Sequence, residues 1–138
     1  METEPRERIL IVEDDEDVGK VLRLRLGREG YETHVEGTGK GALSYAADCR
    51  PDLVVLDVRL PDMSGLQVAK QLRKLSLPWE LPILMLTGLD QPVDKLYGFA
   101  FGADAYLTKP YDPAELLKTV KALLGELPRY FADRMRAT

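Results

Sequence analysis

Residues 53–66 read Leu53-Val-Val-Leu-Asp-Val-Arg-Leu-Pro-Asp-Met-Ser-Gly-Leu66, an apolar run that leads into a carboxylate and then into turn-forming residues. A short apolar run bounded by turn residues is typical of a strand buried on both faces of a parallel sheet. The carboxyl ends of such strands are where open α/β sheets bind their ligands. Asp57 is therefore a candidate site residue. From this stretch alone, the alternative that Asp57 only caps the following turn stays equally open.

Length and composition limit the class of protein. A chain of 138 residues is long enough for one domain with a real core. The formal net charge of −4 disfavours direct binding of nucleic acid by this segment. No apolar run approaches the roughly 18 residues of a membrane span, and no secretory leader is visible, so we expect a cytoplasmic protein without membrane contact. The single cysteine, Cys49, excludes an internal disulfide framework.

Strand-like and helix-like segments alternate along the whole chain. This alternation predicts a parallel sheet with right-handed crossovers and helices on both faces. The expected strands are residues 9–12, 31–36, 53–56, 83–86 and 105–107. Helical spacing predicts that the following residues face the core: Val18, Val21, Leu22 and Leu26; Ala42, Leu43, Ala46 and Ala47; Val68, Leu72 and Leu75; Leu96 and Phe99; and Leu116, Val120, Leu123 and Leu124.

Four of the predicted strands end in polar side chains: Glu13 and Asp14 follow the first, Asp57 the third, Thr87 the fourth and Lys109 the fifth. Parallel strands share one carboxyl edge, so we expect these groups to converge. Three clustered carboxylates repel one another unless a cation holds them, and oxygen ligands with room for water suit Mg²⁺. A lysine and a hydroxyl suit a tetrahedral anion. The combination indicates phosphoryl transfer onto an aspartate.

Four motifs in a fixed order resemble the receiver domain of two-component response regulators, over about residues 6–126. The resemblance implies a flavodoxin-like, doubly wound, five-stranded parallel sheet with strand order 2-1-3-4-5 and five helices on two faces. It divides the chain into an N-terminal tail (1–7), a receiver domain (8–126) and a C-terminal stretch (127–138) that is a tail, a helical extension or a linker to a missing output domain. The motifs are Ile9-Leu-Ile-Val-Glu-Asp-Asp15, Val54-Val-Leu-Asp-Val-Arg-Leu-Pro-Asp-Met-Ser-Gly65, Leu84-Met-Leu-Thr-Gly88 and Gly102-Ala-Asp-Ala-Tyr-Leu-Thr-Lys-Pro110.

The resemblance assigns roles to the acidic residues. Asp57 matches the phosphoacceptor of the family, and Glu13 and Asp14 match its acidic pair. By this match, Asp14, Asp57 and the backbone carbonyl of Arg59 would contact Mg²⁺, and Glu13 would act through water. The phosphoryl donor implied is the phosphohistidine of a sensor histidine kinase or of a phosphotransfer protein.

The resemblance also assigns roles to the groups around the phosphoryl position. Lys109 would pair with the phosphoryl group, and its peptide bond to Pro110 is expected to be cis. Thr87 would hydrogen-bond a phosphoryl oxygen. Tyr106 matches the aromatic switch residue that moves inward when Thr87 moves. The implied activity is regulatory, limited to self-phosphotransfer and autodephosphorylation, and is not catalysis on an outside substrate.

The surface formed by the fourth helix, the fifth strand and the fifth helix would change its partner preference on phosphorylation. Many family members that dimerise through this surface carry charged residues at the positions of Tyr97, Ala100, Ala105 and Gly125. This chain presents a more apolar face there. We therefore expect either a different partner, such as an output domain, or a homodimer held by apolar contacts.

Three alternatives compete with a phosphorylated receiver. A degenerate receiver would act as an interaction module without phosphorylation, although every expected site group is present. A phosphatase that forms an aspartyl-phosphate would carry a second acid two residues after its nucleophile, where Arg59 stands. A flavin protein of this fold would carry a phosphate-binding loop after the first strand, where the acids Glu13 to Asp17 would repel a phosphate.

Overall fold

A computed structural model of the chain describes residues 6–75 and 80–125. The predictions for residues 1–5 and for the C-terminal stretch 127–138 lie outside these described residues. Among the described helices, none combines the length and the apolar character that a membrane crossing requires.

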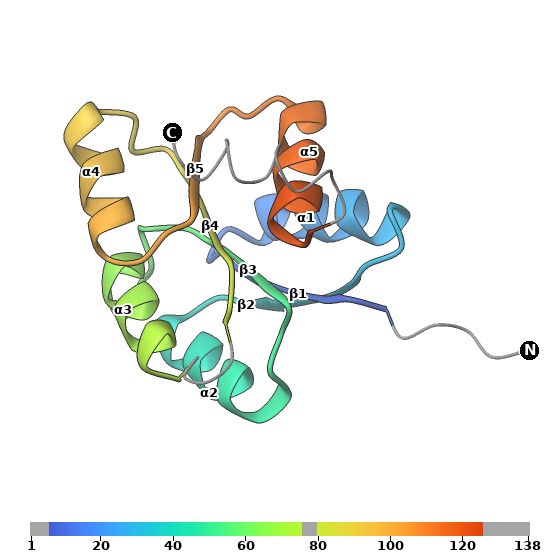
Figure 1. Cartoon of the computed structure of the whole chain (residues 1–138), viewed down its shortest axis with the longest axis horizontal. Helices are drawn as coiled ribbons and strands as arrows, with labels where there is room; N and C mark the ends of the chain where they lie inside the picture. The colour runs from blue at the N-terminus through green and yellow to red at the C-terminus, as the bar shows by residue number, and fades with distance from the viewer. Residues whose placement is uncertain (1–5, 76–79, 126–138) are drawn as a thin grey trace, which may run out of the picture.

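The described residues form one parallel sheet with the strand order β2-β1-β3-β4-β5, and helices alternate with its strands (Figure 1). The predicted fold class and strand order are thereby confirmed. The strands are β1 (Arg8–Val12), β2 (Glu32–Glu36), β3 (Leu53–Leu56), β4 (Ile83–Thr87) and β5 (Ala105–Thr108). The helices are α1 (Glu16–Arg28), α2 (Gly39–Cys49), α3 (Gly65–Leu75), α4 (Pro92–Ala100) and α5 (Pro113–Leu123).

The sheet is buried on both faces because helices cover each side. Successive side chains of a strand point to opposite faces. One set packs with buried residues of α1 and α5, and includes Ile9, Ile11 and Leu53. The other set packs with α2 and α3, and includes Leu10 and Val54. Figure 1 shows α1 and α5 together on one side of the sheet and α2 and α3 on the other.

The register of the strands aligns their carboxyl ends. Val12 of β1 lies level with Leu56 of β3, and Leu56 lies level with Met85 of β4. At the far side of the sheet, Thr87 of β4 pairs with Thr108 of β5. The residues that follow these positions therefore emerge from one edge.

Several residues predicted to face the core lie at the surface instead. Val21 and Leu75 are each 42% exposed, because the buried stripes of their helices run through Gly19, Leu22 and Leu26 in α1 and through Val68, Ala69 and Leu72 in α3. Ala47 of α2 is also exposed. The prediction was most clearly wrong for α4, where Leu96 is 67% and Phe99 40% exposed.

Close packing of α4 against the sheet occurs at Gly98. A Cβ atom at this position would lie 2.8 Å from Cδ2 of Tyr106 and 3.0 Å from Sδ of Met85. The helix therefore meets the sheet through its smallest residue, and its larger apolar side chains turn outward.

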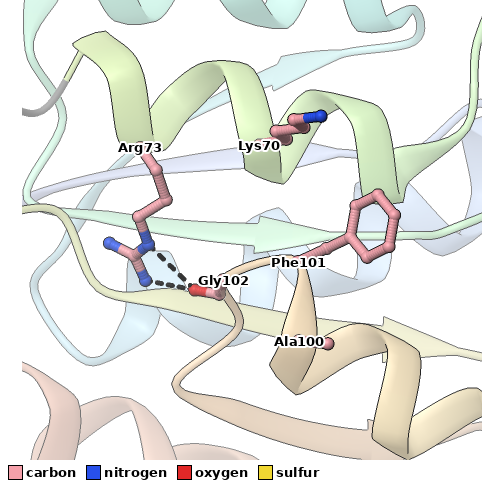
Figure 2. Close-up of a pocket in the computed structure, with 5 residues that line it drawn as sticks. All are labelled: Lys70, Arg73, Ala100, Phe101 and Gly102. Atoms are coloured by element: carbon pink, nitrogen blue, oxygen red, sulfur yellow. Dashed lines mark hydrogen bonds between the residues drawn. The ribbon is translucent and has the colours of Figure 1, made fainter.

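Arg73, in the last turn of α3, binds residues at the edge of the sheet where β4 and β5 begin, opposite to the carboxyl ends of the strands (Figure 2). Its Nε donates to the carbonyl of Gly102 at 2.9 Å, and its guanidinium also bonds Asp104 at 2.7 Å and the carbonyl of Leu81. Asp104 in turn accepts from the backbone N–H of Ile83 at 2.9 Å. One side chain thus connects α3 to the start of β4 and to the turn between α4 and β5.

Candidate functional site

The backbone at the carboxyl edge of the sheet is held by hydrogen bonds that extend beyond the strands. The N–H of Asp57 donates to the carbonyl of Val12 at 3.0 Å, and the N–H of Lys109 donates to the carbonyl of Thr87 at 2.8 Å. Each of these site residues is therefore held at a fixed position against the strand beside its own. The predicted convergence of polar groups at this edge is observed.

Lys109 binds two buried carboxylates. Its Nζ donates to Oδ2 of Asp57 at 2.8 Å and to Oε1 of Glu13. Glu13 is 4% and Asp57 8% exposed, so both acids are largely shielded from water. One ammonium group balances only one of the two negative charges, and a buried charge without a partner is costly.

Glu13, Asp14 and Asp57 form an acidic cluster in which one oxygen atom of each lies within 4.8 Å of the others. Oε2 of Glu13 is buried and has no hydrogen-bond partner among the described residues. Asp14 is exposed, so that solvent reaches the cluster from its side. Clustered carboxylate oxygens, an unused buried acceptor and access for water fit a hard divalent cation that keeps part of its water shell.

Burial and Lys109 act on the two acids in opposite ways. Burial raises the pKa of Glu13 to about 7, although the Lys109 hydrogen bond works against this. Burial also acts to raise the pKa of Asp57, but the hydrogen bonds from Lys109 and from the backbone N–H of Arg59 outweigh it, so that this pKa is lowered. Burial alone would lower the pKa of Lys109, but its two carboxylate partners raise it. Asp57 and Lys109 therefore stay ionised at neutral pH, whereas Glu13 exchanges its proton near pH 7.

The loop between β3 and α3, residues 57–64, turns back toward Asp57. The N–H of Arg59 donates to Oδ1 of Asp57 at 3.0 Å, and Arg59 forms an isolated bridge with Ser64. The N–H of Gly65 donates to the carbonyl of Val58 at 2.7 Å. A Cβ atom at Gly65 would lie 2.1 Å from the carbonyl oxygen of Asp57, so only glycine fits where the loop closes. The backbone of Arg59 is thus held beside the Asp57 carboxylate.

Thr87 and Tyr106 meet at the loop that follows β4. Thr87 is fully buried, and its hydroxyl accepts from the N–H of Leu89 at 3.4 Å. The hydroxyl of Tyr106 donates to the carbonyl of Leu89 at 2.8 Å, and burial followed by the charge of Asp94 raises the pKa of Tyr106 to about 12. Both side chains therefore contact the same loop residue from different strands.

The peptide bond between Lys109 and Pro110 is cis, as predicted. It lies at the end of β5, directly after the lysine that binds both buried acids.

The sequence did not predict one contact near the site, which joins the loop after β3 to α2. Asp62, in the loop after β3, accepts hydrogen bonds from the backbone N–H groups of Gly39 and Lys40 at the start of α2. The motif around Asp62 indicates only a turn, and no local pattern relates it to residues that lie 22 and 23 positions earlier. The link depends on how α2 and the loop are packed in three dimensions.

The cavity between α3 and α4 is separate from this site. It has a volume of about 390 Å³ and is lined by Lys70, Arg73, Ala100, Phe101 and Gly102 (Figure 2). None of the strand-end groups described above contributes to it.

The strand order, the acidic cluster and the lysine that pairs with a buried aspartate define a receiver-type α/β protein. The family model of the response regulator receiver domain matches residues 9–121, and the chain belongs to this family. The family is that of two-component signalling, and the acidic residues of its pocket are present here.

Individual relatives agree with this assignment. The chain is 45% identical over 117 residues to the alkaline phosphatase synthesis transcriptional regulatory protein PhoP of Bacillus subtilis (strain 168), a match that covers 85% of this chain and 48% of that protein. The chain thus spans about half the length of this relative.

Solved structures show the same fold. A CheY-like response regulator receiver domain protein from Methanospirillum hungatei JF-1 has a TM-score of 0.82 at 32% identity, covering 88% of this chain and 96% of that one. The BeF3-activated N-terminal receiver domain of RstA from Klebsiella pneumoniae has a TM-score of 0.80 at 35% identity, covering 86% of this chain and 98% of that one.

Proposed function

We propose that this chain is a phosphorylation-dependent signalling switch in which Asp57 accepts a phosphoryl group from the phosphohistidine of a sensor histidine kinase or phosphotransfer protein. The observation that carries the proposal is the state of Asp57. It is buried, its pKa is lowered, it bonds Lys109 at 2.8 Å, and it belongs to the acidic cluster with Glu13 and Asp14. An ionised carboxylate beside a cation is suited to act as the nucleophile in phosphoryl transfer.

The acidic cluster fits Mg²⁺. Asp14, Asp57 and the backbone carbonyl of Arg59 would hold the ion, and Glu13 would act through water. When bound, the ion supplies positive charge that offsets the charge of the transferring phosphoryl group. The buried and unpaired Oε2 of Glu13 supports this assignment, because it leaves one acceptor free on the side of the cluster.

The side chains of this chain carry out the remaining steps. A carboxylate oxygen of Asp57 forms the new P–O bond as the P–N bond to the donor histidine breaks. Lys109, already within hydrogen-bond distance of that carboxylate, then pairs with a phosphoryl oxygen. The hydroxyl of Thr87 donates to another phosphoryl oxygen, which it reaches from the neighbouring strand.

Movement of Thr87 would pass the signal to the surface of α4, β5 and α5. Thr87 and Tyr106 both bond Leu89, so a shift of Thr87 changes the loop on which the Tyr106 hydroxyl rests. Phosphorylation then favours one of two arrangements of this loop and of α4, and with it a different partner. The partner is an output domain, another protein or a second copy of the chain.

The test is phosphorylation with a small donor. The protein is incubated with Mg²⁺ and acetyl phosphate, and its intact mass is measured. We expect one added phosphoryl group on the wild type and none on Asp57→Ala, because the nucleophile is gone. Asp52→Ala removes an exposed acid that bonds the N–H of Arg8 at 2.7 Å, remote from the acidic cluster, and should be phosphorylated normally.

A wild type that takes up no phosphoryl group, or uptake that survives Asp57→Ala, would reject the proposal. The first result would favour a degenerate receiver that acts as an interaction module without phosphorylation.

A further inference from the structure

Asp62 attaches the loop between β3 and α3 to the start of α2. Its Oδ1 accepts from the N–H of Gly39 at 2.8 Å, and its Oδ2 accepts from the N–H of Lys40 at 3.0 Å. Both carboxylate oxygens are therefore used. The hydrogen bonds from these two amides lower the pKa of Asp62, and the bond from Lys40 contributes most.

The start of α2 needs acceptors from outside the helix. The first N–H groups of an α-helix have no partner within the helix. Thr38, the residue before the helix, serves one of them, since its hydroxyl accepts from the N–H of Gly41 at 3.0 Å. Asp62 serves two more, those of Gly39 and Lys40, and its negative charge lies at the positive end of the helix dipole. Asp62 thus completes the cap of α2 from a distant segment.

An apolar contact accompanies the polar one. A Cβ atom at Gly39 would lie 2.4 Å from Cγ and 2.6 Å from Sδ of Met63, so the Met63 side chain fills the space that glycine leaves open. Two adjacent residues of the loop, Asp62 and Met63, therefore rest on the first turn of α2.

The other end of the same loop forms part of the site. Arg59 donates its N–H to the Asp57 carboxylate at 3.0 Å and bridges to Ser64 on the far side of Asp62. A loop that is closed on itself and fixed at Asp62 has little freedom to move at Arg59.

We propose that Asp62 is a positioning residue for the Mg²⁺ site, because its attachment to α2 holds the backbone carbonyl of Arg59 and the Asp57 carboxylate in place for the ion. This inference rests on the proposed function and adds to it a residue that does not touch the ion. Loss of the attachment should weaken binding of Mg²⁺ before any phosphoryl group is present.

The test measures Mg²⁺ affinity by titration calorimetry on the unphosphorylated protein. Asp62→Ala removes both acceptors, and we expect its Kd for Mg²⁺ to rise about two- to fivefold. This factor corresponds to the free energy with which a carboxylate stabilises the start of a helix. Asp62→Asn keeps one acceptor and should fall between this variant and the wild type. Gly39→Ala leaves Asp62 intact but displaces Met63, and should also weaken Mg²⁺ binding.

A matched control and a measurement of the attachment itself accompany the titration. Asp52→Ala, which removes an exposed carboxylate bonded to the N–H of Arg8, should keep the wild-type Kd. Amide hydrogen exchange without Mg²⁺ should be faster at Gly39 and Lys40 in Asp62→Ala. Equal Mg²⁺ affinity in Asp62→Ala and Asp52→Ala would overturn the inference alone, whereas a wild type that does not bind Mg²⁺ would overturn the proposed function as well.

Discussion

Glu13 and Asp57 share one lysine but differ in how strongly they hold a proton. Burial raises the pKa of Glu13 to about 7, above its ordinary value of 4.5. A raised pKa means that the folded state binds the proton more tightly, so Glu13 stabilises the fold fully below pH 4.5 and loses this contribution as the pH rises through about 7. The lowered pKa of Asp57 acts in the opposite sense and only at lower pH.

Glu13→Gln should therefore flatten the pH dependence of stability in the metal-free protein. We expect the free energy of unfolding of the wild type to fall by about 1–3 kcal/mol from pH 5 to pH 8 relative to the variant. Glutamine has the shape of the protonated acid but cannot ionise as the pH rises. Urea unfolding in the presence of a chelator, repeated across this pH range, checks this. Parallel curves for the two proteins would contradict it.

The positions of the site residues could be predicted from sequence, but their charge states could not. Parallel topology brings Asp57, Glu13 and Lys109 to one edge regardless of side-chain detail. Which acid keeps a proton depends on hydrogen bonds as well as burial, because Glu13 and Asp57 are both buried but Asp57 also accepts from the backbone N–H of Arg59. The sequence does not reveal that difference. The roles assigned to these residues stay predictions until phosphorylation is measured.

At the scale of elements, α4 shows why helical periodicity can give the wrong face. The helix has nine residues and carries apolar side chains on more than one side, so several choices of inner face fit its pattern. The side chain of Tyr106, in β5, fills the space between α4 and the sheet, so only a glycine of α4 fits against it. Gly98 therefore faces inward and Leu96 faces outward. The contact that decides the inner face comes from a residue of β5, so the sequence of the helix alone cannot reveal it.

Arg73 shows how one side chain can join elements that the sheet does not connect. Arg73→Ala should lower the free energy of unfolding by about 1–3 kcal/mol, because it leaves the partly buried carboxylate of Asp104 and the carbonyl of Gly102 without this donor. Lys70→Ala is the matched control one turn earlier on α3, where an exposed lysine should change stability by less than about 0.5 kcal/mol. Thermal and urea unfolding of both variants measure this. Equal stability of the two would show that the Arg73 contacts add nothing to the fold.

At the scale of the molecule, exposed apolar side chains gather on α4. Among the described residues, Val93, Leu96 and Tyr97 are 50%, 67% and 53% exposed. Their spacing places them on one side of the helix, which agrees with the proposed partner surface of α4, β5 and α5. The patch lies on the helix that follows the Thr87 and Tyr106 loop, so a change at Asp57 can alter how it is presented.

We expect Mg²⁺ and beryllofluoride, a mimic of the phosphoryl group, to shift the protein from monomer to dimer through this patch. Leu96→Lys should weaken the dimer about tenfold or more, because a charge replaces an apolar contact at the centre of the patch, while phosphorylation of Asp57 by acetyl phosphate is unchanged. Leu24→Lys on α1 is the control, since Leu24 is the same residue type at a similar exposure of 60% on the opposite face of the sheet. Sedimentation equilibrium measures both variants. A monomer with and without the mimic would exclude the homodimer, and the apolar face of α4 would then serve a different protein or an output domain.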